Sequence, residues 1–291
     1  MEKRWISCNA CGADDFIKLS SVGEWDIGKC ARCELIYVNP APFFEPTPEF
    51  SQVSKEFQYT AYMHQKITPA ILAHERSQLL GHLREIARLT GHNLQSPRYL
   101  EVGCGSGASV RAATDLGWSA TGIDIDPELI RAGQEQLHVD LRCTPLLESG
   151  FADGEFHFIR MRDVIEHLPN PYDCLVMIRR LLTPEGVALF VTPNEDGLPT
   201  RARILFGRPR GEVATVPPPH HIHGFTPRTL NRLLERAGFK VLDGKTTTPV
   251  DPEYVTSNNM RSARKLASIG IWQGAKVLGM GSMVVSWAGK P

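Results

Sequence analysis

The chain lacks the long apolar run of a membrane helix, because no stretch approaches the roughly 18 to 20 consecutive apolar residues that cross a bilayer. Its first residues, MEKRWISCNACG, also lack the apolar core of a secretory signal peptide. The longest apolar tracts, GVALFVTP and GSMVVSW, have the length of buried strands. We therefore expect a cytoplasmic protein that makes no use of a membrane.

Net charge is absent as well, since 32 Lys and Arg residues balance 32 Asp and Glu residues. Such a balance provides no overall field to attract nucleic acid, so a small-molecule substrate is the expected partner. One local cluster of arginines stands out, formed by Arg201, Arg203, Arg208 and Arg210. Paired guanidinium groups suit the diphosphate of a nucleotide sugar, although the cluster is equally consistent with a solvated loop face.

Seven cysteines in a cytoplasmic chain are interpreted as thiols or metal ligands rather than disulfides. Four of them form two C-x-x-C pairs, Cys8 with Cys11 and Cys30 with Cys33. This spacing is typical of a tetrahedral structural zinc site. A segment of about forty residues buries too little surface to fold alone, and a bound metal would supply the missing stability. We predict a zinc ribbon over residues 1–40, with unrelated thiols or a redox pair as the alternatives.

Residues 41–97 are predicted to contain a proline-rich linker and then amphipathic helices, because apolar residues recur at helical spacing from 60 to 90. From residue 98 onward, strand and helix patterns alternate. Strands are expected at 99–102, 119–125, 139–143, 156–160, 187–192, 240–246 and 282–288. Helices are expected at 108–116, 127–137, 172–182 and 227–237. This alternation predicts an α/β domain over residues 98–291, with a Rossmann-like, mostly parallel sheet and helices on both faces.

Two segments of this domain fall outside the alternation. Residues 195–222 are rich in proline and arginine and are predicted to form an irregular lid, since long loops in compact domains are usually functional. Residues 249–281 are predicted to be a helical insertion that walls the substrate pocket or forms a homodimer contact.

The stretch YLEVGCGSGASV contains the glycines Gly103, Gly105 and Gly107 directly after a predicted strand. Such a turn lets a ligand approach bare backbone, and the pattern satisfies the dinucleotide fingerprint. With Glu101 in front of it, the pattern is also the form that binds S-adenosylmethionine. In either case Asp124, at the end of the next strand, can hold the two ribose hydroxyl groups.

Three later segments favour the second cofactor: FHFIRMRDVIEHLPNP, LLTPEGVALFVTPN and HHIHGFTPRTLNRLLERAGFKV. In this order they resemble the class I S-adenosylmethionine-dependent methyltransferases, particularly the branch similar to ubiquinone-pathway O-methyltransferases. The segment KCARCELIYVNPAP resembles the zinc ribbon that precedes this domain in many bacterial members, often thought to act on sugars or secondary metabolites.

The resemblance implies a seven-stranded sheet whose last strand is antiparallel, and it assigns the cofactor-binding residues. These residues are Glu101, Gly103, Gly105, Gly107, Asp124, Ile125, Leu146 and Arg162. The chain departs from the family at Thr144-Pro145, where an acid usually contacts the adenine, and at His157, where an aspartate usually follows Phe156. The first departure puts the adenine contact in question.

Methyl transfer from a sulfonium requires little beyond alignment and removal of a proton, for which histidine is well suited. His221 and His223 match an H-x-H of the family that faces the substrate, so they are the first candidates for the general base. Glu166 and His167 are further catalytic candidates. Together with Asp163 they resemble an E-x-x-E-H metal motif, which raises the possibility of a divalent cation at Asp163, Glu166 and His167. The alternative is that these side chains are a scaffold for the cofactor pocket.

The sequence therefore predicts a methyltransferase that acts on a small molecule, with a sugar or nucleotide-linked sugar favoured as acceptor. One alternative is an RNA methyltransferase whose ribbon binds nucleic acid, but the even charge balance argues against it. Another is a non-catalytic scaffold that binds the cofactor and docks a partner protein through its ribbon.

Overall fold

The computed structural model describes residues 2–43, 67–205, 218–248, 271, 273–275 and 277–291. Several predictions lie outside these residues. They concern Arg208, Arg210, the side chain of Arg203, the prolines after residue 43, and most of the predicted insertion at 249–281.

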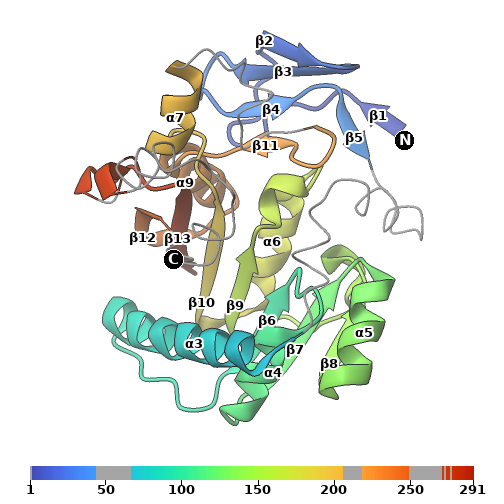
Figure 1. Ribbon diagram of the computed structural model, residues 1–291, viewed down its shortest axis with the longest axis vertical. Helices are drawn as coiled ribbons and strands as arrows, with labels where there is room; N and C mark the ends of the chain where they lie inside the picture. The colour runs from blue at the N-terminus through green and yellow to red at the C-terminus, as the bar shows by residue number, and fades with distance from the viewer. Residues whose placement is uncertain (1, 44–66, 206–217, 249–270, 272, 276) are drawn as a thin grey trace, which may run out of the picture.

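A seven-stranded sheet with the strand order β12-β13-β10-β9-β6-β7-β8 forms the centre of the molecule (Figure 1). The strands are β6 (Arg98–Val102), β7 (Ser119–Asp124), β8 (Asp140–Cys143), β9 (Phe156–Arg162), β10 (Leu182–Pro193), β12 (Lys240–Thr247) and β13 (Met283–Gly289). Strand β13 pairs antiparallel with β10 and β12, whereas β10, β9, β6, β7 and β8 pair in parallel. The predicted seven-stranded sheet with an antiparallel last strand is confirmed.

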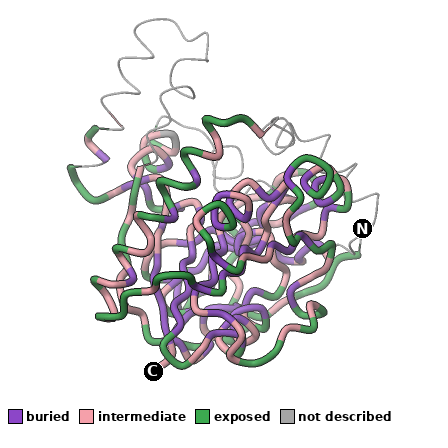
Figure 2. Tube along the Cα trace, turned by 90° about the horizontal axis from the view of Figure 1, so that it is seen from below, coloured by how far each residue is buried: buried purple, intermediate pink, exposed green. Residues whose placement is uncertain are grey.

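Helices cover both faces of this sheet. They are α3 (Pro69–Thr90), α4 (Ala108–Asp115), α5 (Pro127–Leu137), α6 (Pro171–Leu181) and α9 (Pro227–Arg236). A further helix, α7 (Leu198–Leu205), follows β10. Successive strand residues point to opposite faces, so Tyr99 packs with the residues of α3 and α4, and Leu100 packs with those of α6 and α9. Figure 2 shows the resulting buried interior between the exposed outer turns.

Helix starts follow from the sequence at four positions where a capping residue precedes a proline. Thr68, Asp126, Asn170 and Thr226 each accept a hydrogen bond from a backbone N–H of the first turn. A proline at the first helical position costs no intrahelical hydrogen bond, because a backbone N–H at that position has no acceptor within the helix.

Residues 2–43 form a small body of short strands: β1 (Glu2–Arg4), β2 (Phe16–Val22), β3 (Trp25–Cys30), β4 (Ile36–Val38) and β5 (Ala41–Phe43). Strands β1 and β5 pair with each other, and β2, β3 and β4 form an antiparallel sheet. Strand β4 begins three residues after the second C-x-x-C pair. A fourth strand, β11 (His223–Gly224), joins this sheet from the far end of the chain by pairing with β4. We call residues 2–43 the ribbon and residues 220–225 the strap.

The lid expected to be irregular contains a helix, because α7 occupies residues 198–205. Strand β10 also begins five residues earlier than expected, since Leu182 pairs with Phe156 before a bulge interrupts the ladder. Within the residues that the structure describes, no helix is long and apolar enough to cross a membrane.

Candidate functional site

The glycine turn after β6 adopts a conformation that other residues disfavour. Gly103, Gly105 and Gly107 have φ angles of 74°, 53° and 82°. A Cβ on Gly103 would lie 2.1 Å from Cγ2 of Val164, and a Cβ on Gly107 would lie 2.8 Å from the Leu141 side chain. Two of the glycines are therefore required both by backbone conformation and by space. The turn presents bare backbone at the carboxyl ends of the parallel strands, where α/β proteins bind ligands.

Asp124 holds this turn from the neighbouring strand. Its Oδ2 accepts a hydrogen bond from the Gly105 amide at 2.8 Å, and its Oδ1 accepts one from the Asp126 amide at 2.9 Å. Asp126 instead caps α5, as its position before Pro127 indicates. Burial raises the pKa of Asp124 while the backbone N–H groups oppose that shift. A carboxylate has about four acceptor sites, so Asp124 retains acceptor capacity for a hydroxyl group of a ligand.

The acid in front of the turn, Glu101, is buried in a network of side chains. Ser109 donates to Oε2 of Glu101 at 2.9 Å, Arg160 donates to the same atom at 2.7 Å, and the Tyr99 hydroxyl group is a third donor. Arg160 also donates to Glu75 of α3 at 2.8 Å. Sequence reasoning missed Arg160 and Glu75. The available signal was an arginine within the apolar strand FHFIRMR, since a charge buried there requires a partner.

The remaining cofactor candidates lie around the same edge of the sheet. Arg162 follows Met161, which pairs with the last residue of β6, and its guanidinium group donates to Glu75 at 2.8 Å. The Arg162 side chain is 36% exposed to solvent. Leu146 is buried in the short 3-10 helix η1 (Leu146–Glu148) that follows β8. Ile125 directly follows Asp124 and is half-buried. At the position of the family's adenine-binding acid, the Thr144 amide donates to the Asp124 carbonyl oxygen at 3.0 Å.

A second cluster brings together Glu166, His167 and His221. Each offers one possible ligand atom, and these atoms lie within 4.8 Å of one another. The imidazole rings of His167 and His221 meet edge to face with centroids 4.5 Å apart. Glu166 and His167 belong to the 3-10 helix η2 (Ile165–His167), which follows β9. Asp163 is exposed and does not join this cluster, so His221 occupies the place that the sequence assigned to Asp163.

Burial dominates the electrostatics of this cluster. It raises the pKa of Glu166, and the Asp163 carboxylate adds to the shift. The Glu166 Oε2 atom accepts a hydrogen bond from the Thr192 hydroxyl group at 2.9 Å. Burial and the neighbouring His221 lower the pKa of His167 to about 3. The ring nitrogen Nδ1 of His167 lies 2.8 Å from the His220 carbonyl oxygen, which can only accept. The neutral ring therefore carries its proton on Nδ1 and its lone pair on Nε2.

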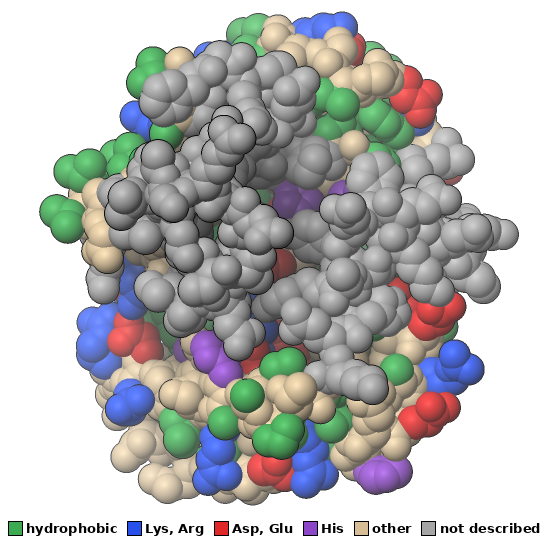
Figure 3. Space-filling model, viewed as in Figure 1, with side chains coloured by type: hydrophobic (Ala, Val, Ile, Leu, Met, Phe, Trp, Pro, Cys, Tyr) green, Lys and Arg blue, Asp and Glu red, His purple; other side chains and the backbone are tan. Residues whose placement is uncertain are grey.

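His221 and His223 have different surroundings, although the sequence placed them together. The His223 ring stacks between Tyr37 of the ribbon and Phe225, with interplanar angles of 15° and 21°. Only 1% of His223 is exposed, and burial lowers its pKa to about 3. His221 faces Glu166 and His167 instead. In the space-filling view, histidine side chains are visible just below the hydrophobic residues of the ribbon (Figure 3).

The four cysteines of the ribbon converge as their spacing predicts. Their sulfur atoms lie within 4.8 Å of one another, with 3.4 Å between Cys8 and Cys33 and 3.5 Å between Cys11 and Cys30. Zn–S bonds of about 2.3 Å in a tetrahedron place sulfur atoms roughly 3.8 Å apart. The four thiols are free of disulfides and fit such an ion.

The sheet order, the glycine turn and the acids at the ends of the first two strands define a class I S-adenosylmethionine-dependent methyltransferase. The chain belongs to the family described as "Methyltransferase domain", which matches residues 72–243. This match begins within α3, so that helix is part of the family's domain.

Two relatives named ubiquinone biosynthesis O-methyltransferase are 26 to 28% identical to the chain over the aligned residues. The one from Dinoroseobacter shibae is 28% identical over 180 residues, which cover 56% of this chain and 70% of the relative. The one from Azoarcus sp. is 26% identical over 196 residues, which cover 61% of this chain and 82% of the relative.

Solved structures share the fold at lower identity. The 1,6-didemethyltoxoflavin-N1-methyltransferase of Burkholderia thailandensis, solved with bound 1,6-didemethyltoxoflavin and S-adenosylhomocysteine, has a TM-score of 0.51 at 16% identity. The match covers 94% of this chain and 98% of that one. A SAM-dependent methyltransferase of Thermotoga maritima has a TM-score of 0.52 at 16% identity, covering 85% of this chain and 100% of its own.

Proposed function

We propose that the chain transfers the methyl group of S-adenosylmethionine to a hydroxyl group of a small molecule, with His221 as the general base. The observation that carries this proposal is the contact between the glycine turn and the segment that holds Glu166 and His167. Val164 lies so close to Gly103 that a Cβ there would overlap it. The proton-accepting cluster is therefore adjacent to the turn that would receive the cofactor.

The residues at the ends of the strands fit this cofactor. The bare backbone of the glycine turn suits the methionine portion, and the remaining acceptor capacity of Asp124 suits a ribose hydroxyl group. The partly exposed guanidinium group of Arg162 suits the carboxylate of that portion. When bound, S-adenosylmethionine supplies a methyl group on a sulfonium whose departure as a neutral thioether requires no acid.

The protein then has to orient the acceptor and remove its proton. His221 would take the hydroxyl proton on its imidazole ring. A carboxyl oxygen of Glu166 lies within 4.8 Å of a ring nitrogen of His221, and Glu166 would orient that ring. His167 is not assigned as the base, because burial and His221 lower its pKa to about 3. His223 is buried against the ribbon and is assigned a positioning role.

The relatives' names support a hydroxyl acceptor, because both that we compared are O-methyltransferases. The test is release of S-adenosylhomocysteine by the purified protein with catechols, sugars and nucleotide-linked sugars, small amines and total RNA. We expect turnover with a small hydroxyl compound. Turnover with RNA alone, or none with the cofactor bound, would replace the proposal by one of the two alternatives given by the sequence.

The base is tested by His221→Ala, which should lower kcat about 10²- to 10⁴-fold without weakening S-adenosylhomocysteine binding. The exposed His92 provides a matched control, and His92→Ala should retain the full rate. If His221→Ala keeps most of the rate, the base lies elsewhere.

A divalent cation held by Glu166, His167 and His221 is a second candidate, favoured by the convergence of one carboxylate and two imidazole groups. Two histidines and one carboxylate form a recurrent metal-binding set, and a cation there would orient and acidify a hydroxyl acceptor. Binding of Co²⁺ would be followed by its visible absorption in the wild type and in His221→Ala. Full turnover after removal of metal from this cluster, with ribbon zinc retained, would exclude the cation.

We propose zinc as the structural ion of the ribbon, held by Cys8, Cys11, Cys30 and Cys33. Four thiolates close a tetrahedral coordination shell, so this ion would support the fold rather than the reaction.

A further inference from the structure

The strap that carries His221 is built into the ribbon as its fourth strand. Gly224 and His223 pair with Ile36 and Tyr37 of β4, and the amide of Val38 donates to the Ile222 carbonyl oxygen at 2.9 Å. Three residues of the strap, Ile222 to Gly224, therefore lie beside the strand that follows the second cysteine pair.

On its other side, the strap is hydrogen-bonded to the turn that carries Glu166 and His167. We call Glu166, His167 and His221 the catalytic cluster and residues 165–167 the catalytic turn. The Ile222 amide donates to the Glu166 carbonyl oxygen at 2.7 Å, and the His220 carbonyl oxygen accepts from His167 at 2.8 Å. Ile222 thus bonds through its carbonyl oxygen to the ribbon and through its amide to the catalytic turn. One peptide segment connects the two.

Side-chain packing reinforces the same connection. The Ile222 side chain is fully buried in the core of the ribbon, together with Trp25, Ile27 and Val38. The residue next to it, His221, faces the catalytic cluster. Removing the ribbon core would therefore leave Ile222 without its packing partners and His221 without a fixed neighbour.

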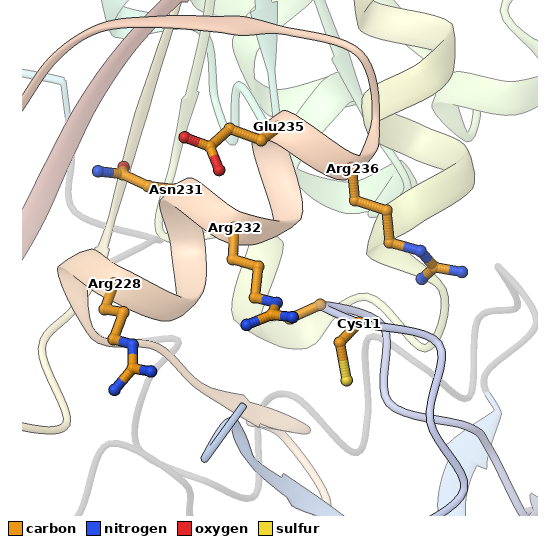
Figure 4. A pocket seen from close by; sticks show the side chains of 7 residues that line it. Cys11, Arg228, Asn231, Arg232, Glu235 and Arg236 are labelled. Atoms are coloured by element: carbon orange, nitrogen blue, oxygen red, sulfur yellow. The ribbon is translucent and has the colours of Figure 1, made fainter. Parts of the chain in front are cut away.

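Asn9 connects the first cysteine pair itself to the strap. It lies between Cys8 and Cys11, and its Nδ2 is 3.4 Å from Nε2 of His223. Its backbone carbonyl oxygen accepts a hydrogen bond from Arg236 of α9. Figure 4 shows α9 with Arg236 beside the loop that bears Cys11. The loop is thus held between the strap and a helix of the main domain.

We propose that the metal-bound ribbon positions the general base: it holds the strap so that His221 meets Glu166 and His167, with Ile222 and Asn9 as the positioning residues. This inference rests on the proposed role of His221. According to this proposal the ribbon contributes to the reaction by positioning the general base, although its four cysteines lie outside the catalytic cluster. The glycine turn makes no contact of this kind with the ribbon in the described part of the chain, so the cofactor site should be independent of it.

The experiment measures amide hydrogen exchange in the full-length, zinc-loaded protein and after removal of zinc by a chelator. We expect exchange in residues 220–225 to accelerate about 10-fold or more, and exchange in residues 103–110 to change less than about 2-fold. Affinity for S-adenosylhomocysteine should stay the same. Unchanged exchange in the strap, or equal acceleration in both segments, would overturn the proposal.

Two variants test the same proposal with all four cysteines in place, so that the ribbon can still bind zinc and fold. Ile222→Ala and Asn9→Leu should retain one zinc per chain and the wild-type cofactor affinity, while kcat falls about 10-fold or more and strap exchange rises. Leu19→Ala, at an exposed position of β2, is the matched control and should leave each readout unchanged. Wild-type kcat and strap exchange in both variants would also overturn the proposal.

Failure of the proposed function would give a different pattern. If His221→Ala retained the rate while zinc removal still accelerated exchange in the strap, the general base would be misassigned. The positioning of the strap by the ribbon would nevertheless stand.

Discussion

Arg160 donates a hydrogen bond to Glu101 at 2.7 Å although only 1% and 4% of the two side chains are exposed. The same guanidinium group reaches Glu75 at 2.8 Å, so α3 is connected to the acid that precedes the cofactor turn. A buried charge that loses its partner has no water to replace it.

Replacement of Arg160 should therefore be costly. Arg160→Met leaves Glu75 and Glu101 without their shared partner, and we expect the free energy of unfolding to fall by about 3 to 5 kcal/mol. Urea denaturation measures it. Arg201 and Asp196 form a matched control pair at 2.6 Å, with both side chains 54% exposed. Arg201→Met should change stability by less than about 1 kcal/mol. Equal effects of the two substitutions would contradict the assignment.

Stability should decline in acid before most carboxylates titrate. Burial lowers the pKa of His82 and His167 to about 3. The unfolded chain binds these protons near pH 6.5 whereas the folded protein does not, so stability is fully present above pH 6.5 and is lost as pH falls towards 3. The slope is at most about 1.4 kcal/mol per pH unit for each histidine. His82→Phe should reduce the slope measured by urea denaturation between pH 6 and 4, and an unchanged slope would refute this account.

A second decline should follow at lower pH. Burial alone would raise the pKa of Glu75, but the guanidinium groups of Arg160 and Arg162 lower it to about 2. Its contribution is present above the unfolded pKa of about 4.3 and is lost as pH falls to about 2. Glu75→Gln should flatten the stability curve in this window, as followed by thermal unfolding. A curve as steep as that of the wild type would show that Glu75 is not responsible.

Alanine substitutions distinguish the glycines of the turn from an ordinary helical glycine. Gly103→Ala and Gly107→Ala introduce a Cβ at positive φ that meets Val164 or Leu141. We expect S-adenosylhomocysteine affinity to fall at least about 10-fold by calorimetry, together with a lower Tm. Gly81 in α3 has no atom near its Cβ position, so Gly81→Ala should stabilise the protein by about 0.5 to 1 kcal/mol with unchanged affinity. Wild-type affinity in the two turn variants would exclude this site.

The ribbon should hold one zinc ion per chain. Cys30→Ser removes one of the four converging sulfur atoms and should abolish zinc retention after dialysis, measured by elemental analysis. Cys174→Ser changes a buried cysteine outside the ribbon and should keep the ion. Retention of a full equivalent by Cys30→Ser would contradict the four-cysteine site.

The sequence by itself determined the features that depend on local patterns. Strand and helix periodicity predicted the sheet, and the spacing of Cys8, Cys11, Cys30 and Cys33 predicted their convergence. The glycine turn with Asp124 was also readable, because its residues lie at the ends of consecutive strands and its conformation is set by the backbone.

Only the tertiary structure decided which distant residues meet. Asp163 is near Glu166 in sequence, yet a positive φ of 54° turns the chain there, and His221 from the strap completes the cluster instead. His221 and His223 are two residues apart but separate, because stacking on Tyr37 draws His223 into the ribbon. The pairing of β11 with β4 joins segments nearly two hundred residues apart. Contacts between residues far apart in the sequence cannot be predicted from a local repeat of apolar residues. They depend on which side chains are buried and which groups form hydrogen bonds once the whole chain has folded.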